Sequence, residues 1–163
     1  MTAEREVRAI APDGGFILYR IRYKQVYPRW TLSVISVEGS VTEYDGPDLY
    51  WAMQDWRRHL EQCGQTLLCQ GARPAVFPSA MASDMGGGIK AYVNQLPPYR
   101  ESLELIDIFD EASPEEVGTV QQQEDFRKQW AEAFHQRGGT LGRIKRKAQS
   151  LWWKVTLRRG KNT

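Results

Sequence analysis

A period-two alternation near the N-terminus is the strongest constraint on the fold of this 163-residue chain. Over residues 16–24, large apolar or aromatic side chains alternate with mostly charged ones, which is typical of a strand with one buried face. The buried positions are Ile17, Tyr19, Ile21 and Tyr23. A β-branched segment over 30–38 follows after a short loop at 26–29. The two segments are predicted to pair as an antiparallel hairpin.

A helix is predicted after the hairpin. Pro47 suits a first helical turn, and Gly64 suits the residue that stops the helix. Between them one apolar stripe recurs at spacings of four, three and four residues. Its members are Leu49, Met53, Trp56 and Leu60. A short strand over 66–69 is predicted to follow the helix.

The second half of the chain predicts two more strands and a long helix. Residues 71–88 hold two prolines and four glycines and indicate no regular element, whereas 89–93 and 103–109 are strand candidates. Ser113 and Glu116 form a capping box around Pro114, which predicts a helix from 114 to about 135. The element order is therefore β-β-α-β-β-β-α-α. We expect an α+β fold with an antiparallel or mixed sheet of about five strands and helices packed on it.

The charge of the chain divides sharply after residue 136. Nine Lys or Arg and no acid lie in 137–163, which leaves 13 bases against 20 acids in 1–136. We therefore expect an acidic α+β domain over 1–136 and a basic amphipathic helix over 137–163, packed on the same domain. The apolar stripe of that helix is Leu141, Ile144, Ala148, Leu151 and Val155.

The residue patterns that usually accompany catalysis are missing from the sequence. The two histidines, His59 and His135, belong to no HExxH or CxxC motif, so neither a metal site nor a cofactor is predicted. No GxSxG motif marks a nucleophilic serine, and Cys63 and Cys69 are predicted to be free, buried thiols. We expect a protein that is not an enzyme and takes no small-molecule substrate.

Two segments carry candidate binding residues. The Gly86, Gly87 and Gly88 run predicts a tight turn with at least one positive φ, and its backbone amides offer an alternative anion cradle. The acidic run begins at Asp107 and continues through Asp110 and Glu111 to 115 and 116. It is interpreted as a solvated helix start, with paired catalytic carboxylates or a docking edge for a basic partner as alternatives.

The sequence also predicts the cellular compartment in which the protein is located. No run of about 18 apolar residues is present, and the first nine residues are charged and lack the apolar core of a signal peptide. A cytoplasmic location is therefore expected.

One block of the chain resembles a known kind of protein. Gly-Ala-Arg at 71–73, Pro-Ser-Ala-Met at 78–81, Met-Gly-Gly-Gly at 85–88, Ala-Tyr at 91–92 and Ile-Asp-Ile-Phe at 106–109 occur in this order. The block, over about 65–110, resembles small bacterial immunity proteins encoded beside polymorphic or type VI-secreted toxins. The resemblance implies a partner that is a cognate toxin domain, inhibited by occlusion of its active site or its access to substrate.

The expected partner-binding residues come from this block, including its loop with Tyr99, and from the acidic run. They are Arg73, Asp84, Met85, Gly86, Gly87, Gly88, Tyr99, Asp107, Asp110 and Glu111.

Three alternatives stay open. The first is an adaptor that binds nucleic acid or an anionic membrane surface through the basic C-terminal helix, where Trp152 and Trp153 lie beside cations. The second is an enzyme whose site joins Arg73, Asp84 and Asp107. The third is a scaffold or assembly protein.

Overall fold

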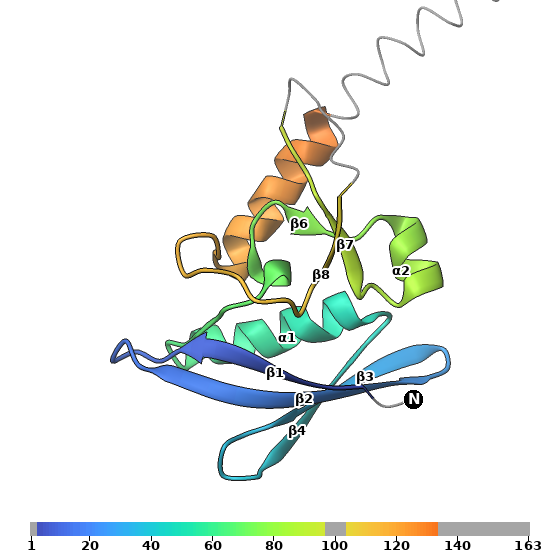
Figure 1. Ribbon diagram of the computed structural model, residues 1–163. Coiled ribbons are helices and arrows are strands. Elements are labelled where there is room, and N and C mark those ends of the chain that lie inside the picture. The colour runs from blue at the N-terminus through green and yellow to red at the C-terminus, as the bar shows by residue number, and fades with distance from the viewer. Residues whose placement is uncertain (1–2, 97–103, 134–163) are drawn as a thin grey trace, which may run out of the picture.

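Five antiparallel strands form the larger of two sheets in the computed structural model, which describes residues 3–96 and 104–133 (Figure 1). The strands are β1 (Ala3–Ile10), β2 (Phe16–Val26), β3 (Arg29–Ile35), β4 (Val41–Gly46) and β5 (Thr66–Leu67). They lie in the order β4-β3-β2-β1-β5 and the sheet is curled. The predicted hairpin is confirmed, with Tyr23 opposite Leu32 in the β2–β3 register.

The helix α1 (Leu49–Gln62) covers the inner face of this sheet, as Figure 1 shows. All four members of its predicted stripe are buried, so the amphipathic pattern is confirmed. The helix begins at Leu49, two residues later than predicted from Pro47, because Asp48 is the N-cap and accepts a hydrogen bond from the amide of Trp51. Gly64 follows the helix with φ 72°, a backbone conformation that suits glycine.

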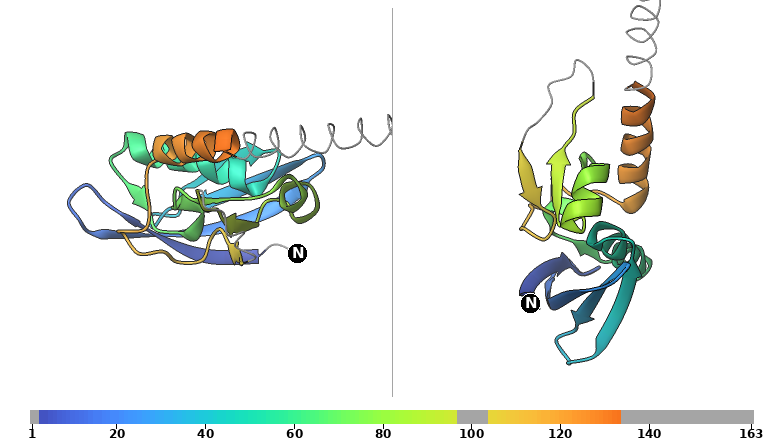
Figure 2. Two further views of the ribbon diagram at one scale, coloured as in Figure 1. Left: turned by 90° about the horizontal axis from the view of Figure 1, so that it is seen from above. Right: turned by 90° about the vertical axis from the view of Figure 1, so that its right-hand side faces the viewer.

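The elements after α1 build a second, three-stranded sheet in the order β6-β7-β8. The elements are η1 (Gln70–Ala72), β6 (Val76–Phe77), α2 (Ala80–Gly86), β7 (Lys90–Val93), β8 (Leu105–Asp107) and a helix over 120–133. This second layer lies on the side of α1 away from the larger sheet (Figure 2). The fold is therefore α+β, as the sequence predicts.

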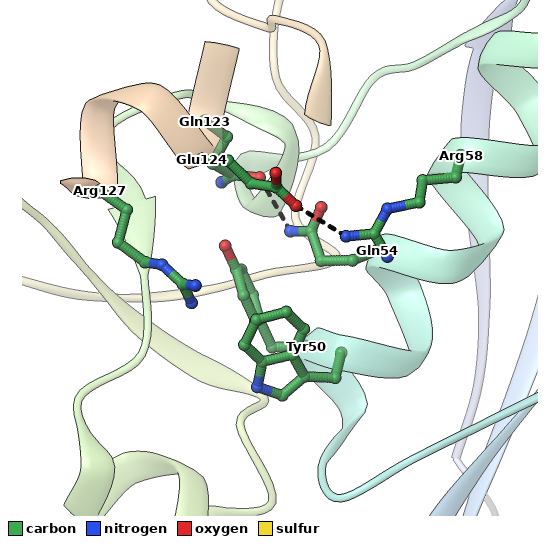
Figure 3. A pocket seen from close by; sticks show the side chains of 7 residues that line it. Tyr50, Gln54, Arg58, Gln123, Glu124 and Arg127 are labelled. Atoms are coloured by element: carbon green, nitrogen blue, oxygen red, sulfur yellow. Dashed lines mark hydrogen bonds and ion pairs between the residues drawn. The ribbon is translucent and has the colours of Figure 1, made fainter. Parts of the chain in front are cut away.

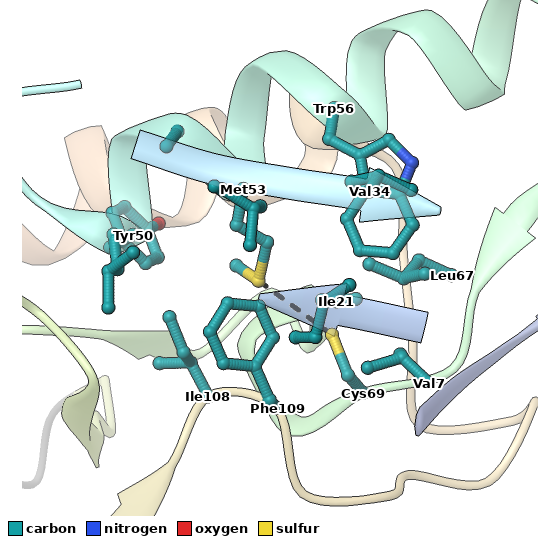
Figure 4. Close-up of a cluster of buried hydrophobic side chains, with 14 of the residues drawn as sticks. Val7, Ile21, Val34, Tyr50, Met53, Trp56, Leu67, Cys69, Ile108 and Phe109 are labelled. Carbon is teal, nitrogen blue, oxygen red and sulfur yellow. Dashed lines mark hydrogen bonds between the residues drawn. The ribbon is translucent and has the colours of Figure 1, made fainter. Parts of the chain in front are cut away.

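One hydrophobic cluster connects the two layers (Figure 4). Met53 of α1 lies between Ile21 of the larger sheet and Ile108, which follows β8, whereas Trp56 lies beside Val34 and Leu67. The ring of Phe109 stacks on Tyr23 with the centroids 5.8 Å apart. The core thus holds the second layer in a fixed position relative to the hairpin.

Several sequence predictions are corrected by the structure. Strands β1 and β4 were not predicted, and the second strand of the hairpin ends at Ile35 rather than at residue 38. The segment 71–88, expected to be irregular, contains β6 and α2. Cys63 is exposed instead of buried, whereas Cys69 is buried; both are free thiols.

The long helix begins at residue 120 and not at 114. The amide and hydroxyl of Ser113 do donate to Glu116 Oε2, but this capping box closes an isolated turn. A second box starts the helix: the amide of Gln122 donates to Thr119 Oγ1, and the amide of Thr119 donates to Gln122 Oε1.

Two remaining predictions concern the chain as a whole. The basic helix over 137–163 lies outside the described residues, so its packing on the acidic domain stays a prediction. Within 3–96 and 104–133, no helix has the length and apolar character needed to cross a membrane.

Deletion of residues 138–163 is expected to lower the melting temperature by about 5 °C, because an apolar stripe that packs on the body loses about 2 kcal/mol of burial. Thermal unfolding of the full and shortened chains, followed by circular dichroism, measures this. A shortened protein with unchanged stability that no longer binds DNA, RNA or anionic vesicles at low salt would contradict the packing and favour the adaptor alternative.

Candidate partner-binding surface

The short helix α2 presents two methionine side chains to solvent. Met81 and Met85 are one helical turn apart and therefore lie on the same face, with 71% and 84% of their surfaces exposed. Ser79 is the N-cap, and its Oγ accepts a hydrogen bond from the amide of Ala82. A helix that keeps two long apolar side chains in water has a face that no described residue covers.

The glycines after α2 form a tight turn, as predicted. Gly87 has φ 62° and Gly88 has φ 70°, so both adopt the left-handed conformation that favours glycine. A Cβ at Gly87 would overlap the indole ring of Trp30, and a Cβ at Gly88 would lie 2.7 Å from Cγ of Asp48. The turn therefore has an architectural function: it lets the backbone approach β3 and the start of α1 closely.

Asp48 fixes α2 to the start of α1. This carboxylate is fully buried and accepts hydrogen bonds from the amide of Trp51 at 2.9 Å and from the hydroxyl of Ser83. In addition, the amide of Leu49 donates to the carbonyl of Gly87 at 2.8 Å. These bonds hold the methionine face in one orientation, and a preorganised surface loses little entropy on binding.

The tip of the β2–β3 hairpin lies beside α2 at the same end of the molecule (Figures 1 and 2). Tyr27 at this tip is 89% exposed, and Val26 is also exposed. Trp30, three residues further on, packs under Gly87 and joins the hairpin to α2. We call the exposed apolar residues of this end the α2 surface: Val26, Tyr27, Met81 and Met85.

Five of the sequence-predicted partner residues belong to α2 and its turn: Asp84, Met85, Gly86, Gly87 and Gly88. Tyr99 lies outside the described residues. The sequence block over about 65–110 therefore builds the helix and turn of the α2 surface, whereas Tyr27 of the hairpin comes from outside that block.

The acidic run is not solvated throughout, which corrects the interpretation of Asp107. Its side chain is almost fully buried, with Oδ1 2.7 Å from Arg5 Nη1 and Oδ2 3.3 Å from Lys90 Nζ. Asp110 is exposed and lies 3.7 Å from the same arginine, and Glu111 pairs with Arg8. These three carboxylates thus have cationic neighbours within the molecule.

The three residues proposed for an enzyme site have separate surroundings. Arg73 donates to Gln70 Oε1 at 2.7 Å and lies 3.7 Å from Glu116. Asp107 has its own cations, and Asp84 is exposed on α2. The described contacts therefore do not bring Arg73, Asp84 and Asp107 together.

A buried polar network behind α1 was not anticipated from the sequence. Arg57 donates to Gln54 Oε1 and to the carbonyls of Ala72 and Gly118, and Gln123 donates to three further carbonyls. Figure 3 shows Gln54 and Gln123 facing each other between α1 and the 120–133 helix. The network attaches that helix to the body. The only sequence signal for this network was the presence of polar residues close to the apolar stripes of the helices.

A polar cavity lies at the C-terminal end of α1. It has a volume of about 150 Å³, and Tyr19, Tyr44, His59, Cys63 and Gln65 are among the residues that line it. Tyr44 Oη lies 2.7 Å from His59 Nδ1, and Tyr19 donates to Gln65. Burial raises the pKa of both tyrosines, so they remain protonated. In the part of the chain that the structure describes, no three His, Cys, Asp or Glu residues are placed to hold a metal ion.

Comparison of the sequence with protein-family models and with curated proteins found no match.

Proposed function

We propose that this protein acts by binding another protein through the α2 surface, and that the partner is a bacterial toxin domain which it inhibits. The observation that supports this most directly is the pair of exposed methionines on a helix that is fixed to α1 and lies beside the exposed Tyr27. Contiguous apolar surface of this kind marks interaction sites in soluble proteins.

The composition of the α2 surface suits a protein partner. Methionine side chains are flexible and polarisable, so Met81 and Met85 can adapt to the shape of a partner. Tyrosine is enriched among the residues that contribute most to binding energy at interfaces, because a large ring loses little conformational entropy. Tyr27, at the tip of the β2–β3 hairpin, is a tyrosine of this kind.

The inhibitory function is supported by the sequence resemblance to immunity proteins. The resembling block, 65–110, includes all of α2 and the glycine turn, and so it contains the two methionines of the α2 surface. An inhibitor of this type needs no catalytic group of its own, since it acts by covering the active site of the toxin or the path of its substrate. Electrostatic complementarity between the two proteins would speed association and discriminate between partners.

Co-purification with the product of the neighbouring toxin gene tests the proposal. The Met81→Glu/Met85→Glu double variant is expected to weaken binding of that toxin domain at least 100-fold, because two carboxylates would be desolvated in an apolar contact. Binding is measured by calorimetry, and rescue of toxin-expressing cells is scored in parallel.

A matched control uses exposed apolar residues elsewhere. Val37 and Val41 lie in the β3–β4 hairpin, which is remote from α2 in Figure 1, and both are exposed. The Val37→Glu/Val41→Glu variant is expected to bind normally. If this control lost binding while the methionine variant kept it, the interface would be assigned to the wrong surface; if neither wild type nor variant bound the toxin domain, the inhibitory function would be wrong.

A further inference from the structure

A cavity of about 160 Å³ lies on the other side of α2 from its methionines, between the start of α1, the start of α2 and the 120–133 helix. Its wall includes Tyr50, Trp51, Phe77, Ser79, Ser83 and Arg127. The aromatic side chains give it a rigid apolar wall, while the two hydroxyls and the guanidinium are polar groups that converge on one small volume. This combination is typical of a specific recognition pocket.

Arg127 is the charged group of this cavity. Its guanidinium carbon lies 4.9 Å from the centroid of the Trp51 ring, so a cation–π contact fixes its position. Among the described residues, no carboxylate lies within ion-pair distance of Arg127. Arg58, by contrast, pairs with Asp55 and Glu124. The guanidinium of Arg127 therefore has donors available for an external acceptor.

The neighbouring hydroxyl groups can assist an acceptor. Ser79 Oγ accepts a bond from the amide of Ala82, which leaves its own proton free to donate. Burial raises the pKa of Tyr50 to about 12, so its phenol stays protonated and uncharged. The nearby Asp48 carboxylate already accepts bonds from the start of α1 and from Ser83. Ser83 is therefore not free to donate to a ligand in the cavity.

The size of the cavity decides what kind of ligand it fits. Sites for drug-sized molecules have volumes of about 300–1,000 Å³, roughly two or more times the volume found here. A space of 160 Å³ accommodates one side chain. Ser79 and Ser83 lie on the opposite face of α2 from Met81 and Met85, so a protein that covers the methionines and extends around the start of α2 would also reach this cavity.

We propose that the cavity receives a carboxylate side chain, Asp or Glu, of the bound protein partner. Arg127 would pair with it through two parallel N–H donors while Trp51 keeps the guanidinium in place. The inference rests on the proposed function, because it assumes that a protein covers the α2 surface. It adds the chemistry that the partner must offer: an acidic residue next to an apolar contact.

Two blocked amino acids test the site without the partner. N-acetyl-glutamate amide and N-acetyl-glutamine amide differ only in the charge and donors of the terminal group. Each is titrated into the full chain at an ionic strength of about 0.1 M, and the indole N–H signal of Trp51 is followed by NMR. We expect the glutamate probe to bind at least ten-fold more tightly than the glutamine probe.

Variants assign the effect to the guanidinium. Arg127→Gln should remove the ten-fold preference, Arg127→Lys should retain part of it, and Lys128→Gln should retain all of it, because Lys128 is exposed one position further along the same helix. Circular dichroism checks that each variant is folded. Equal binding of the two probes, an unchanged preference in Arg127→Gln, or tighter binding of inorganic phosphate than of the glutamate probe would overturn the carboxylate site.

Failure of this inference and failure of the proposed function give different results. If the toxin domain binds wild type and Arg127→Gln equally but not the methionine double variant, the carboxylate site is wrong and the protein-binding function holds. If the glutamate probe binds through Arg127 while no toxin domain binds, the site holds and the inhibitory function is wrong.

Discussion

Replacing Arg57 with methionine is expected to lower the free energy of unfolding by about 3–5 kcal/mol, since each orphaned buried acceptor costs about 1–3 kcal/mol. Only 2% of this side chain is exposed, and burial lowers the pKa of its guanidinium. Its donors reach Gln54, Gln123 and the carbonyls of Ala72 and Gly118. Methionine has a similar length but donates no hydrogen bond, so Gln54 Oε1 and the carbonyl of Gly118 would lose this donor. The carbonyl of Ala72 would keep the amide of Gly118, and Gln123 Oε1 would keep Gln54 Nε2.

Replacing a whole buried charged network with apolar residues is sometimes neutral for stability, because no charged group is then left without a partner. That compensation is not available here. Arg57 and Gln123 together satisfy five backbone carbonyls, those of Gly71, Ala72, Arg73, Val76 and Gly118. No substitution removes a backbone carbonyl, so the unsatisfied oxygens would remain in the interior.

Arg58→Met is the matched control, on the same helix and one residue away. The side chain of Arg58 is 40% exposed and pairs with Asp55 and Glu124, contacts that contribute about 0–1 kcal/mol each at a surface. Chemical unfolding of both variants in urea gives the comparison. A loss below 1 kcal/mol for Arg57→Met would show that water replaces the missing donors, and the network would then not be what attaches the 120–133 helix.

The strands that sequence analysis found and those it missed differ in how their inner faces are built. In β2 the inner positions hold Ile17, Tyr19, Ile21 and Tyr23, and the alternation is plain. On β1 the inner position Arg5 is charged and pairs with the buried Asp107 from β8. The inner face of β4 includes Tyr44, which is only partly buried. The apolar alternation of β1 is limited to Val7 and Ala9, and the inner face of β4 offers little beyond Tyr44, so neither strand has the sustained pattern of β2.

The start of the last helix shows how tertiary contacts select between two local signals. Capping boxes at Ser113 and at Thr119 are both formed, and only the second one starts the helix. Between them, the amide of Gly118 donates to the carbonyl of Ala72, and a Cβ at Gly118 would lie 2.7 Å from Cγ of Pro74. The chain must stay extended there to pack on the η1 segment, which no local pattern reveals.

The candidate site was predictable only where its residues are close together in the sequence. The glycine turn and its positive φ follow from three consecutive glycines, and Asp84 and Met85 directly precede the turn in the sequence. Tyr27 and Met81 were not included among the expected partner residues. The Arg127 cavity was missed because its residues come from four separate segments that only the fold brings together.

Replacing Gly87 with alanine is expected to lower the free energy of unfolding by about 2–5 kcal/mol. A left-handed conformation costs a residue with a Cβ about 1–2 kcal/mol, and Gly87 has φ 62°. The added methyl would also overlap the indole of Trp30, and overpacking of a buried contact costs about 1–3 kcal/mol more. Chemical unfolding followed by circular dichroism measures the loss.

Gly86 provides a control, because its replacement is expected to leave the stability unchanged or to raise it. Gly86 is the last residue of α2, its φ is not positive, and a Cβ there would have no heavy atom within 4 Å. Gly86→Ala should therefore be neutral or stabilise the protein by up to about 1 kcal/mol, because alanine favours a helix. If Gly87→Ala were as stable as Gly86→Ala, the close contact between the turn and β3 would be wrong.

The same pair of variants separates stability from binding. A methyl group at Gly87 must push α2 away from Trp30, which shifts Met85 relative to Tyr27 on the α2 surface. Affinity for the partner should therefore fall in Gly87→Ala even at a temperature where the variant is fully folded, and it should be unchanged in Gly86→Ala. Equal affinity of the two variants under those conditions would mean that the partner contacts α2 alone, without the hairpin tip.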